Sequence, residues 1–267
     1  MKYIRFEFED NEFAKLNRYF IKMIIPFVIL VVSAGLLLSK LIIIPAMSGS
    51  SAIDDKSTIK YMKVKPKKFY TLQMGAFESE QNVKLFADRL RKKGIPSFIN
   101  MEMKYYHVTT CADENKAWVT KRLQYYKSLG YNSIIKNMSI NVKDLPEALK
   151  NDQKCALFYS LLKVTGDSIS INQDALRDYE SKKTDDRILK SKLYASYSNI
   201  AKIYNEYKKS STSLDFKEID KKVNDQISLF SEIGKNGGVV DKINIDEKMM
   251  QIIYYYRDIA DKANSLI

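Results

Sequence analysis

The chain has 267 residues, a formal net charge of +12, 45% hydrophobic residues, one histidine and two cysteines. This composition excludes an intrinsically disordered chain, a collagen-like repeat and a small domain held together by disulfides. Because there is one histidine, and because Cys111 and Cys155 are 44 positions apart, the sequence shows no zinc-ligand spacing and no disulfide framework. We therefore expect no metal site and no cofactor, and the length fits one or two folded domains.

Residues 23–46 are predicted to form a transmembrane helix. Ile24–Ile44 is a run of 21 residues with a single charge, Lys40. A helix of this length rises about 31 Å, which is enough to cross a lipid bilayer, and Lys40 lies near its end, where the side chain can reach the headgroups. The alternative is a cleaved signal peptide, whose apolar region typically has about 7 to 15 residues. The longer run here favours an uncleaved anchor in the bilayer.

Charged residues beside this span predict its orientation. Three basic residues within positions 15–22 precede it, whereas residues 47–55 contain no lysine or arginine. By the positive-inside rule, residues 1–22 form a cytoplasmic segment, the bulk of the chain is extracytoplasmic, and the protein is a single-pass protein of the cell membrane. Residues 47–66 are rich in Ser, Lys and Asp, a composition that predicts a linker.

Between residues 67 and 140 the hydrophobic pattern changes between the period of a strand and that of a helix. The predicted order is strand, helix, strand, strand, helix, strand, over residues 69–74, 79–93, 96–99, 104–110, 113–129 and 133–136. Gly94 and Gly130 end the two helices. This order predicts an α+β fold, a β-α-β-β-α-β sandwich in which both helices cover one face of an antiparallel sheet and leave the other face free.

Alternation along the strands predicts which residues lie on the free face. The more apolar side of the first strand, which we expect under the helices, consists of Tyr70, Leu72 and Met74. The free face then holds Phe69, Thr71, Gln73, Tyr105, His107 and Thr109. Such a face suits a sugar, because aromatic rings stack on C–H groups while amide, hydroxyl and imidazole groups exchange hydrogen bonds with sugar substituents.

The stretch Phe69–Phe77, FYTLQMGAF, resembles the opening of a SPOR (sporulation-related repeat) domain. That family has an apolar strand carrying Gln, followed by Gly, a small residue and Phe. The matching residues here are Gln73, Gly75, Ala76 and Phe77. The segments RLRKKGIPSFI and LQYYKSLGYNSII repeat the family's pattern of leucine, basic residues, Gly, an aromatic residue and a strand. The second half departs from the family at residues 110–112, where Thr-Cys-Ala replaces Gly-Pro-Phe, so the start of the second helix is expected to be irregular.

The resemblance implies that residues 67–140 bind septal peptidoglycan, specifically glycan strands stripped of their stem peptides, through the free face of the sheet. The family's glycan contacts fall at Gln73, Ala76, Tyr105, His107 and Ile135. Two of them have a structural alternative: Gln73 would cap the first helix or satisfy a strand edge, and Tyr105 would cover a neighbouring loop. His107 as a metal ligand is disfavoured, because no second ligand follows it at a useful spacing.

The positive charge is concentrated in the predicted sandwich. Residues 61–140 carry +9, residues 1–60 carry +2 and residues 141–267 carry +1. Muramic acid carries a carboxylate, so a basic domain outside the cell has an anionic target, with anionic wall polymers or lipid headgroups as less selective ones. The alternative is that basic residues at helix ends merely complement helix dipoles. An RNA-recognition domain has the same fold, but the third strand lacks its basic Gly-aromatic motif and the topology separates it from RNA, so we expect no nucleic acid partner.

The pattern of residues 141–267 is helical to its end. Helices are predicted at 145–164, 174–209, 216–233 and 245–266. The loops between them are predicted at 165–170, 210–214 and 234–240. Short loops favour antiparallel neighbours, so this region is predicted to form an all-α bundle of about four helices. Its apolar stripes are interpreted first as a core and second as a surface for a protein partner or for self-association.

No catalytic constellation emerges from the sequence. Asp54 with Asp55 and Asp185 with Asp186 are adjacent pairs whose side chains point in different directions, and neither cysteine has a predicted base. We therefore expect a membrane-anchored, non-catalytic protein that binds denuded glycan at the septum, either in vegetative division or in sporulation. The alternative is a membrane-tethered scaffold whose helical bundle binds another protein and whose SPOR-like domain is degenerate.

Overall fold

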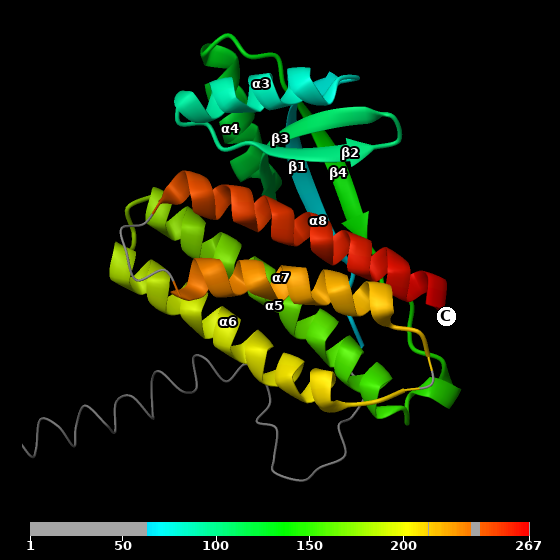
Figure 1. The fold of residues 1–267 in the computed structure, drawn as a ribbon. Helices are drawn as coiled ribbons and strands as arrows, with labels where there is room; N and C mark the ends of the chain where they lie inside the picture. Colours follow the sequence, from blue (N-terminus) through cyan, green and yellow to red (C-terminus); the bar gives the residue numbers. More distant parts are fainter. Residues whose placement is uncertain (1–62, 213, 236–240, 267) are drawn as a thin grey trace, which may run out of the picture. The chain divides into compact units, whose positions relative to one another are not determined.

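The computed structural model describes residues 63–212, 214–235 and 241–266 (Figure 1). It begins with β1 (Lys67–Phe77), α3 (Glu80–Lys92), β2 (Phe98–Glu102), β3 (Tyr105–Asp113), α4 (Lys116–Ser128) and β4 (Ile134–Ile140). The predicted β-α-β-β-α-β order is therefore confirmed. After this sheet domain come the 3-10 turn η2 (Glu147–Leu149) and the helices α5 (Gln153–Glu180), α6 (Asp186–Lys209), α7 (Lys217–Lys235) and α8 (Lys242–Leu266).

Local capping residues set the ends of α3 and α4. The side chains of Ser79 and Asn115 accept hydrogen bonds from the backbone N–H three residues later, at 3.4 and 3.1 Å. Each helix is followed by a glycine with positive φ, Gly94 at 75° and Gly130 at 82°. A side chain at either glycine would be strained, which explains why both helices stop at these residues.

The predicted helix start at Asp113 is wrong, because Asp113 is the last residue of β3. Its carboxylate accepts from the Asn115 N–H at 2.7 Å and forms an ion pair with Arg177 of α5. Residues 110–112, which depart from the SPOR pattern, continue β3 in antiparallel pairing with β1. The departure therefore extends a strand and leaves α4 with an ordinary cap, so the irregular helix start that it suggested is also absent.

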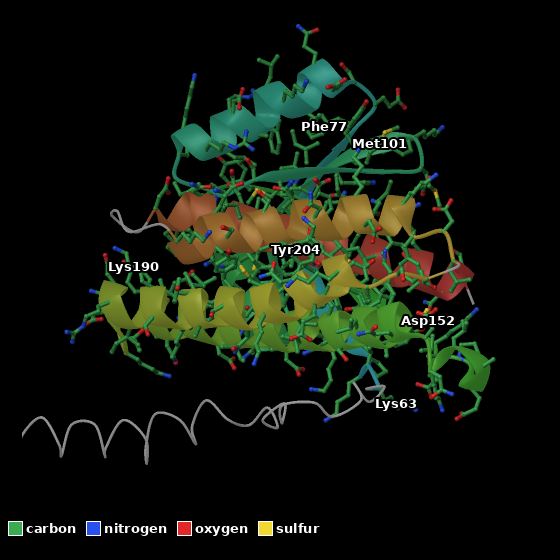
Figure 2. All side chains as sticks on the ribbon, turned by 60° about the horizontal axis from the view of Figure 1, so that its bottom comes forward. Lys63, Phe77, Met101, Asp152, Lys190 and Tyr204 are labelled. Atoms are coloured by element: carbon green, nitrogen blue, oxygen red, sulfur yellow. The ribbon has the colours of Figure 1, made fainter. Side chains whose placement is uncertain are left out.

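The antiparallel sheet has the strand order β2-β3-β1-β4. Its face toward α3 and α4 is apolar, as the alternation predicted: Leu72 and Val108 are buried together with Val83 of α3 and Val119 of α4. Phe77 packs on the same side, and Figure 2 shows it toward α3. The two helices are thus held to the sheet by one small hydrophobic core.

The opposite face of the sheet is not free, which corrects the sequence-based expectation. Helix α8 packs on β2, β3 and β4, so Phe69 is completely buried and Thr71 is only 4% exposed. The Oη of Tyr254 lies 3.2 Å from the hydroxyl of Thr109, and its ring centroid lies 5.1 Å from that of Phe98. The sheet domain and the helical region are therefore parts of one compact unit, not two separate bodies.

The composition of α8 explains why it covers the sheet. Its buried side chains are Ile245, Met249, Met250, Ile252, Ile253, Tyr254, Tyr256, Ile259, Ala260 and Ala263. This set is wider than the single stripe of an ordinary surface helix. One side faces α5 and α7 and the other faces the sheet, so α8 can bury both of its apolar sides only between these two layers.

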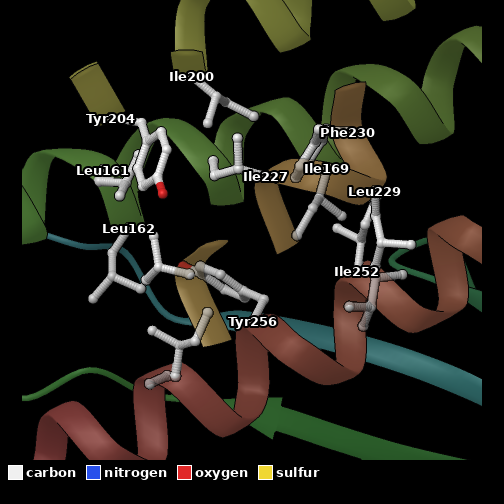
Figure 3. Close-up of a cluster of buried hydrophobic side chains, with 14 of the residues drawn as sticks. Leu161, Leu162, Ile169, Ile200, Tyr204, Ile227, Leu229, Phe230, Ile252 and Tyr256 are labelled. Atoms are coloured by element: carbon white, nitrogen blue, oxygen red, sulfur yellow. The ribbon is translucent and has the colours of Figure 1, made fainter. Parts of the chain in front are cut away.

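Helices α5 to α8 form the predicted bundle within the described residues. α5 packs on α6, α6 on α7, α7 on α8, and α8 returns to α5. Figure 3 shows Tyr256 and Ile252 projecting from α8 into a core that also holds Leu162 of α5 and Phe230 of α7. Figure 2 places Tyr204 of α6 within the same bundle.

The predicted loop at 165–170 is wrong, because α5 continues through it to Glu180. Gly166 is a point of close approach: a Cβ there would lie 2.8 Å from the Oη of Tyr256. The chain turns instead after Ser181, where Lys182 has a φ of 56°. The Asp185 side chain then caps α6 by accepting from the N–H of residue 188 at 2.9 Å.

Membrane insertion is a prediction about another part of the chain. Among the described residues, no helix combines the length and the apolar character that a bilayer crossing requires. The predicted span Ile24–Ile44, the segment 1–22 and most of the predicted linker lie outside the described residues.

Replacing Gly166 with alanine should destabilise the bundle. The added methyl group meets the buried Tyr256 side chain, and overpacking of this kind costs about 1 to 3 kcal/mol, more than the roughly 1 kcal/mol gained in helix propensity. Urea unfolding followed by circular dichroism measures the change. Adding Tyr256→Phe should recover part of the loss, since Oη is the nearest atom. A Gly166→Ala variant more stable than the native chain would contradict this account of the α5–α8 contact.

Candidate functional site

Helix α8 leaves one end of the sheet face accessible. The exposed or half-buried residues there are Ala76, Glu102, Tyr105, His107, Ile134 and Lys136, with Gln73 beneath them at 8% exposure. We call this set the strip. Directly paired residues of antiparallel strands point to the same side, and the pairs Glu102 with Tyr105 and Gln73 with Ile134 place all four strands in it. The strip therefore runs across the strands, beside α8.

A bulge in β1 brings two of the predicted site residues onto the strip. The pairing with β3 shifts on either side of Gln73, so that Gln73 pairs with Thr109 and Ala76 pairs with His107. Without the shift, strict alternation would put positions 73 and 76 on opposite faces. The glycine between them, at position 75, accommodates this irregular backbone, and a Cβ there would lie 2.7 Å from the Phe77 ring.

Gln73 and His107 form the polar centre of the strip. The Nε2 of Gln73 lies 2.7 Å from the Nδ1 of His107 and donates to the carbonyl of Gly75 at 3.3 Å. Because the amide nitrogen can only donate, His107 accepts at Nδ1, and the neutral ring then carries its proton on Nε2. The alternative role of Gln73 as a helix cap does not hold, since Ser79 caps α3.

The charges around the strip are unevenly paired. Arg257 of α8 donates to Glu102 at 2.9 Å and stacks on Tyr254, 4.8 Å from the ring centroid. The ammonium group of Lys104 lies 5.2 Å from the centroid of the Tyr105 ring. Lys136 lies on β4 and makes no ion pair within the described residues. The strip thus presents an aromatic ring, an amide and imidazole pair, and positive charge.

The pKa of His107 is lowered, which favours the neutral imidazole. Burial is the main cause, the positive charge of Lys136 lowers the pKa further, and Glu102 opposes both. A protonated ring would place an N–H against the donating amide of Gln73, so the hydrogen bond between the two side chains depends on the neutral form. The lowered pKa therefore preserves the geometry of the strip at neutral pH.

Four of the five predicted site residues come together, and Ile135 does not. Gln73, Ala76, Tyr105 and His107 share the strip, but Ile135 pairs with Leu72 and packs in the core beneath α3 and α4. Its neighbour Ile134, 56% exposed, is the isoleucine on the strip. The glycan-contact role of these residues is not tested by their positions and stays a prediction.

Sequence reasoning missed Glu102, Lys136 and the α8 residues that border the strip. Alternation on the last strand puts positions 134 and 136 on one face and 135 on the other. Which of the two faces carries the strip depends on how β4 pairs with β1, and periodicity does not reveal that pairing. The sequence did contain a signal that α8 is buried on two sides. One apolar stripe cannot hold three consecutive tyrosines at 254–256 together with the apolar pairs at 249–250 and 252–253.

The described residues offer no evident nucleophile or metal cluster. Burial raises the pKa of the Cys111 thiol to about 12. The pKa of the Cys155 thiol also rises to about 12, through burial and a hydrogen bond with Asp152. Both thiols are therefore protonated at neutral pH and weakly nucleophilic. No group of three or more acidic, cysteine or histidine side chains among these residues could hold a metal ion.

Comparisons with known proteins bear on the sheet domain. Residues 66–137 match the family model of the SPOR domain, which confirms the predicted family for this part of the chain. Among solved structures, the chain is similar to the solution structure of the peptidoglycan binding domain of the B. subtilis cell wall lytic enzyme CwlC. The identity is 23%, the match covers 29% of this chain and 98% of that one, and the TM-score is 0.26. No curated protein matches the chain.

His107 should titrate below its ordinary pKa of 6.5, and the free energy of unfolding should change with pH over the same range. Because the folded pKa is the lower one, its stabilising contribution is complete above pH 6.5 and is lost as the pH falls from 6.5 through the folded pKa. NMR of the single histidine ring in the full chain measures the titration. Lys136→Met should raise this pKa, whereas Lys127→Met on α4 should not. A native value at or above 6.5 would contradict the geometry described.

Proposed function

We propose that this chain is a membrane-anchored, non-catalytic peptidoglycan-binding protein that recognises denuded glycan strands at the division or sporulation septum. The observation that carries the proposal is the strip within a SPOR domain: side chains at four of the family's glycan-contact positions, Gln73, Ala76, Tyr105 and His107, gather on the accessible end of its sheet. The membrane anchor and the septal location rest on the apolar run Ile24–Ile44 and on the family resemblance.

The chemistry of the strip suits a carbohydrate. The half-buried ring of Tyr105 offers a face on which the C–H groups of a sugar can stack. Next to it, the Nε2–H of His107 is a donor for a sugar hydroxyl or an acetamido oxygen. Ala76 is exposed and small, so it lets a sugar approach the backbone of β1 closely. These features supply one stacking contact and one hydrogen-bond donor on β3, and a site of close approach on the adjacent strand β1.

Helix α8 restricts how a glycan can lie. An entirely open sheet would accept a chain along its strands, but here Phe69, Thr71 and Thr109 are covered. The ligand must therefore cross the strands along the strip, with α8 as one wall. Because α8 supplies that wall, the binding unit consists of the sheet and the bundle together, and the full chain is the proper material for tests.

The charge distribution agrees with a wall-associated target. Residues 61–140 carry +9, whereas the bundle and the first 60 residues are nearly neutral. An anionic polymer outside the membrane is attracted to such a surface at long range, which raises the association rate without setting specificity.

The full chain, purified in mild detergent, should sediment more strongly with amidase-treated sacculi than with intact ones. Tyr105→Ala should weaken this binding about threefold to tenfold, the range expected for loss of one aromatic stacking contact. The matched control is Tyr125→Ala, which removes a tyrosine that is 59% exposed on α4, away from the strip. Equal sedimentation with both kinds of sacculi would refute the proposal and favour the scaffold alternative, in which specificity lies in the bundle.

A further inference from the structure

Among the described residues, the basic side chains on or beside the strip include Arg257, Lys104 and Lys136, and the first two already contact other groups of the protein. Arg257 is neutralised by Glu102 at 2.9 Å and by Asp258 at 3.2 Å. The ammonium group of Lys104 lies over the Tyr105 ring, at the β2–β3 turn. Lys136 has no carboxylate partner among the described residues. Unlike Arg257, Lys136 can be approached by a ligand anion without displacing a carboxylate of the protein, and unlike Lys104, which lies at the β2–β3 turn, it lies on a strand of the strip.

Lys136 is also well positioned on the strip. It pairs with Thr71 in the β1–β4 ladder, its carbonyl accepts from the Thr71 hydroxyl at 3.5 Å, and its side chain is half-buried on the same face as Gln73. Lys136 and His107 lie on the same face of the sheet, with β1 between their strands, and the charge of Lys136 lowers the pKa of His107. α8 closes the other half of the face, which leaves the ligand only the path beside Lys136.

Denuded and intact glycan differ in the charge at the lactyl group of muramic acid. In intact peptidoglycan the lactyl group of muramic acid is joined to the stem peptide by an amide. Hydrolysis of that amide leaves a carboxylate on every muramic acid and removes the peptide. A binding site can therefore distinguish the two forms by placing a cation where the lactyl group lies, because a neutral amide gains little from the same cation.

We propose that Lys136 binds the lactyl carboxylate of muramic acid and is the residue by which the strip prefers denuded to peptide-bearing glycan. The inference rests on the proposed function and deepens it, since it names the group of the ligand that is read and the side chain that reads it. Tyr105 and His107 then supply affinity for the sugar ring, and Lys136 supplies the preference for the free carboxylate.

The test uses soluble denuded glycan in two forms, native and with its carboxylates converted to methylamides by carbodiimide coupling. Amidation should weaken binding of the full native chain about twofold to fivefold, as expected for one partly exposed ion pair. Lys136→Gln should bind the native glycan more weakly by a similar factor and should show no further loss on amidation. Binding is measured at one fixed ionic strength, because salt screens the interaction.

Lys127→Gln is the matched control, since it removes the same charge from the exposed side of α4. This variant should keep the full sensitivity to amidation, which separates a local contact from the effect of net charge. If Lys136→Gln remains as sensitive to amidation as the native chain, or if the native chain is insensitive, the role of Lys136 is overturned while binding to denuded glycan still stands. If the native chain binds neither form, the proposed function fails and this inference fails with it.

Discussion

The packing of α8 across the sheet is the constraint on which the rest of this structure depends. Tyr254 is the centre of that contact: its ring lies against Phe98 and its hydroxyl lies 3.2 Å from that of Thr109. Burial of one such side chain contributes about 1.5 to 3 kcal/mol, and its hydroxyl keeps a polar partner. Because the contact uses the middle of the sheet face, it simultaneously completes the bundle core and reduces the ligand surface to a strip at one end.

Ion pairs at the junction orient the two layers more than they stabilise them. Arg122 of α4 pairs with Glu180 of α5 and lies 3.7 Å from Asp246 of α8, and Lys242 contacts both acidic residues at 2.8 and 2.9 Å. Partly buried charges lose much of their hydration, so such a network adds little net stability. A different placement of the helices would leave some of these charges buried without a partner, which costs far more free energy. The network therefore favours one placement of α4 against α5 and α8, and with it one position for the wall of the strip.

The sequence predicted what local patterns control. Ser79 and Gly94 delimit α3, and alternation around Leu72 identified the side of the sheet that lies under the helices. Long-range contacts were beyond such patterns. Gly166 looks like a helix stop, but it is a point of close approach to Tyr256, 90 positions later in the chain. The choice between Ile134 and Ile135 depends on pairing across β1, and the family resemblance by itself implied an open face.

The strip couples its charge to its hydrogen bonding. Lys136 helps to keep His107 neutral, the neutral ring accepts from Gln73, and the amide held in this way also donates to the backbone at the β1 bulge. In the proposed complex a carboxylate beside Lys136 would offset the charge that lowers the pKa of His107, so ligand binding and protonation of the ring would favour each other. By linkage, protonation of His107 would then raise the affinity for the anionic ligand, although the same step removes the acceptor for the Gln73 amide. Binding of a carboxylate at Lys136 thus favours the protonated form of His107, whereas the hydrogen bond from Gln73 requires the neutral form. Lys136 links these two opposing effects.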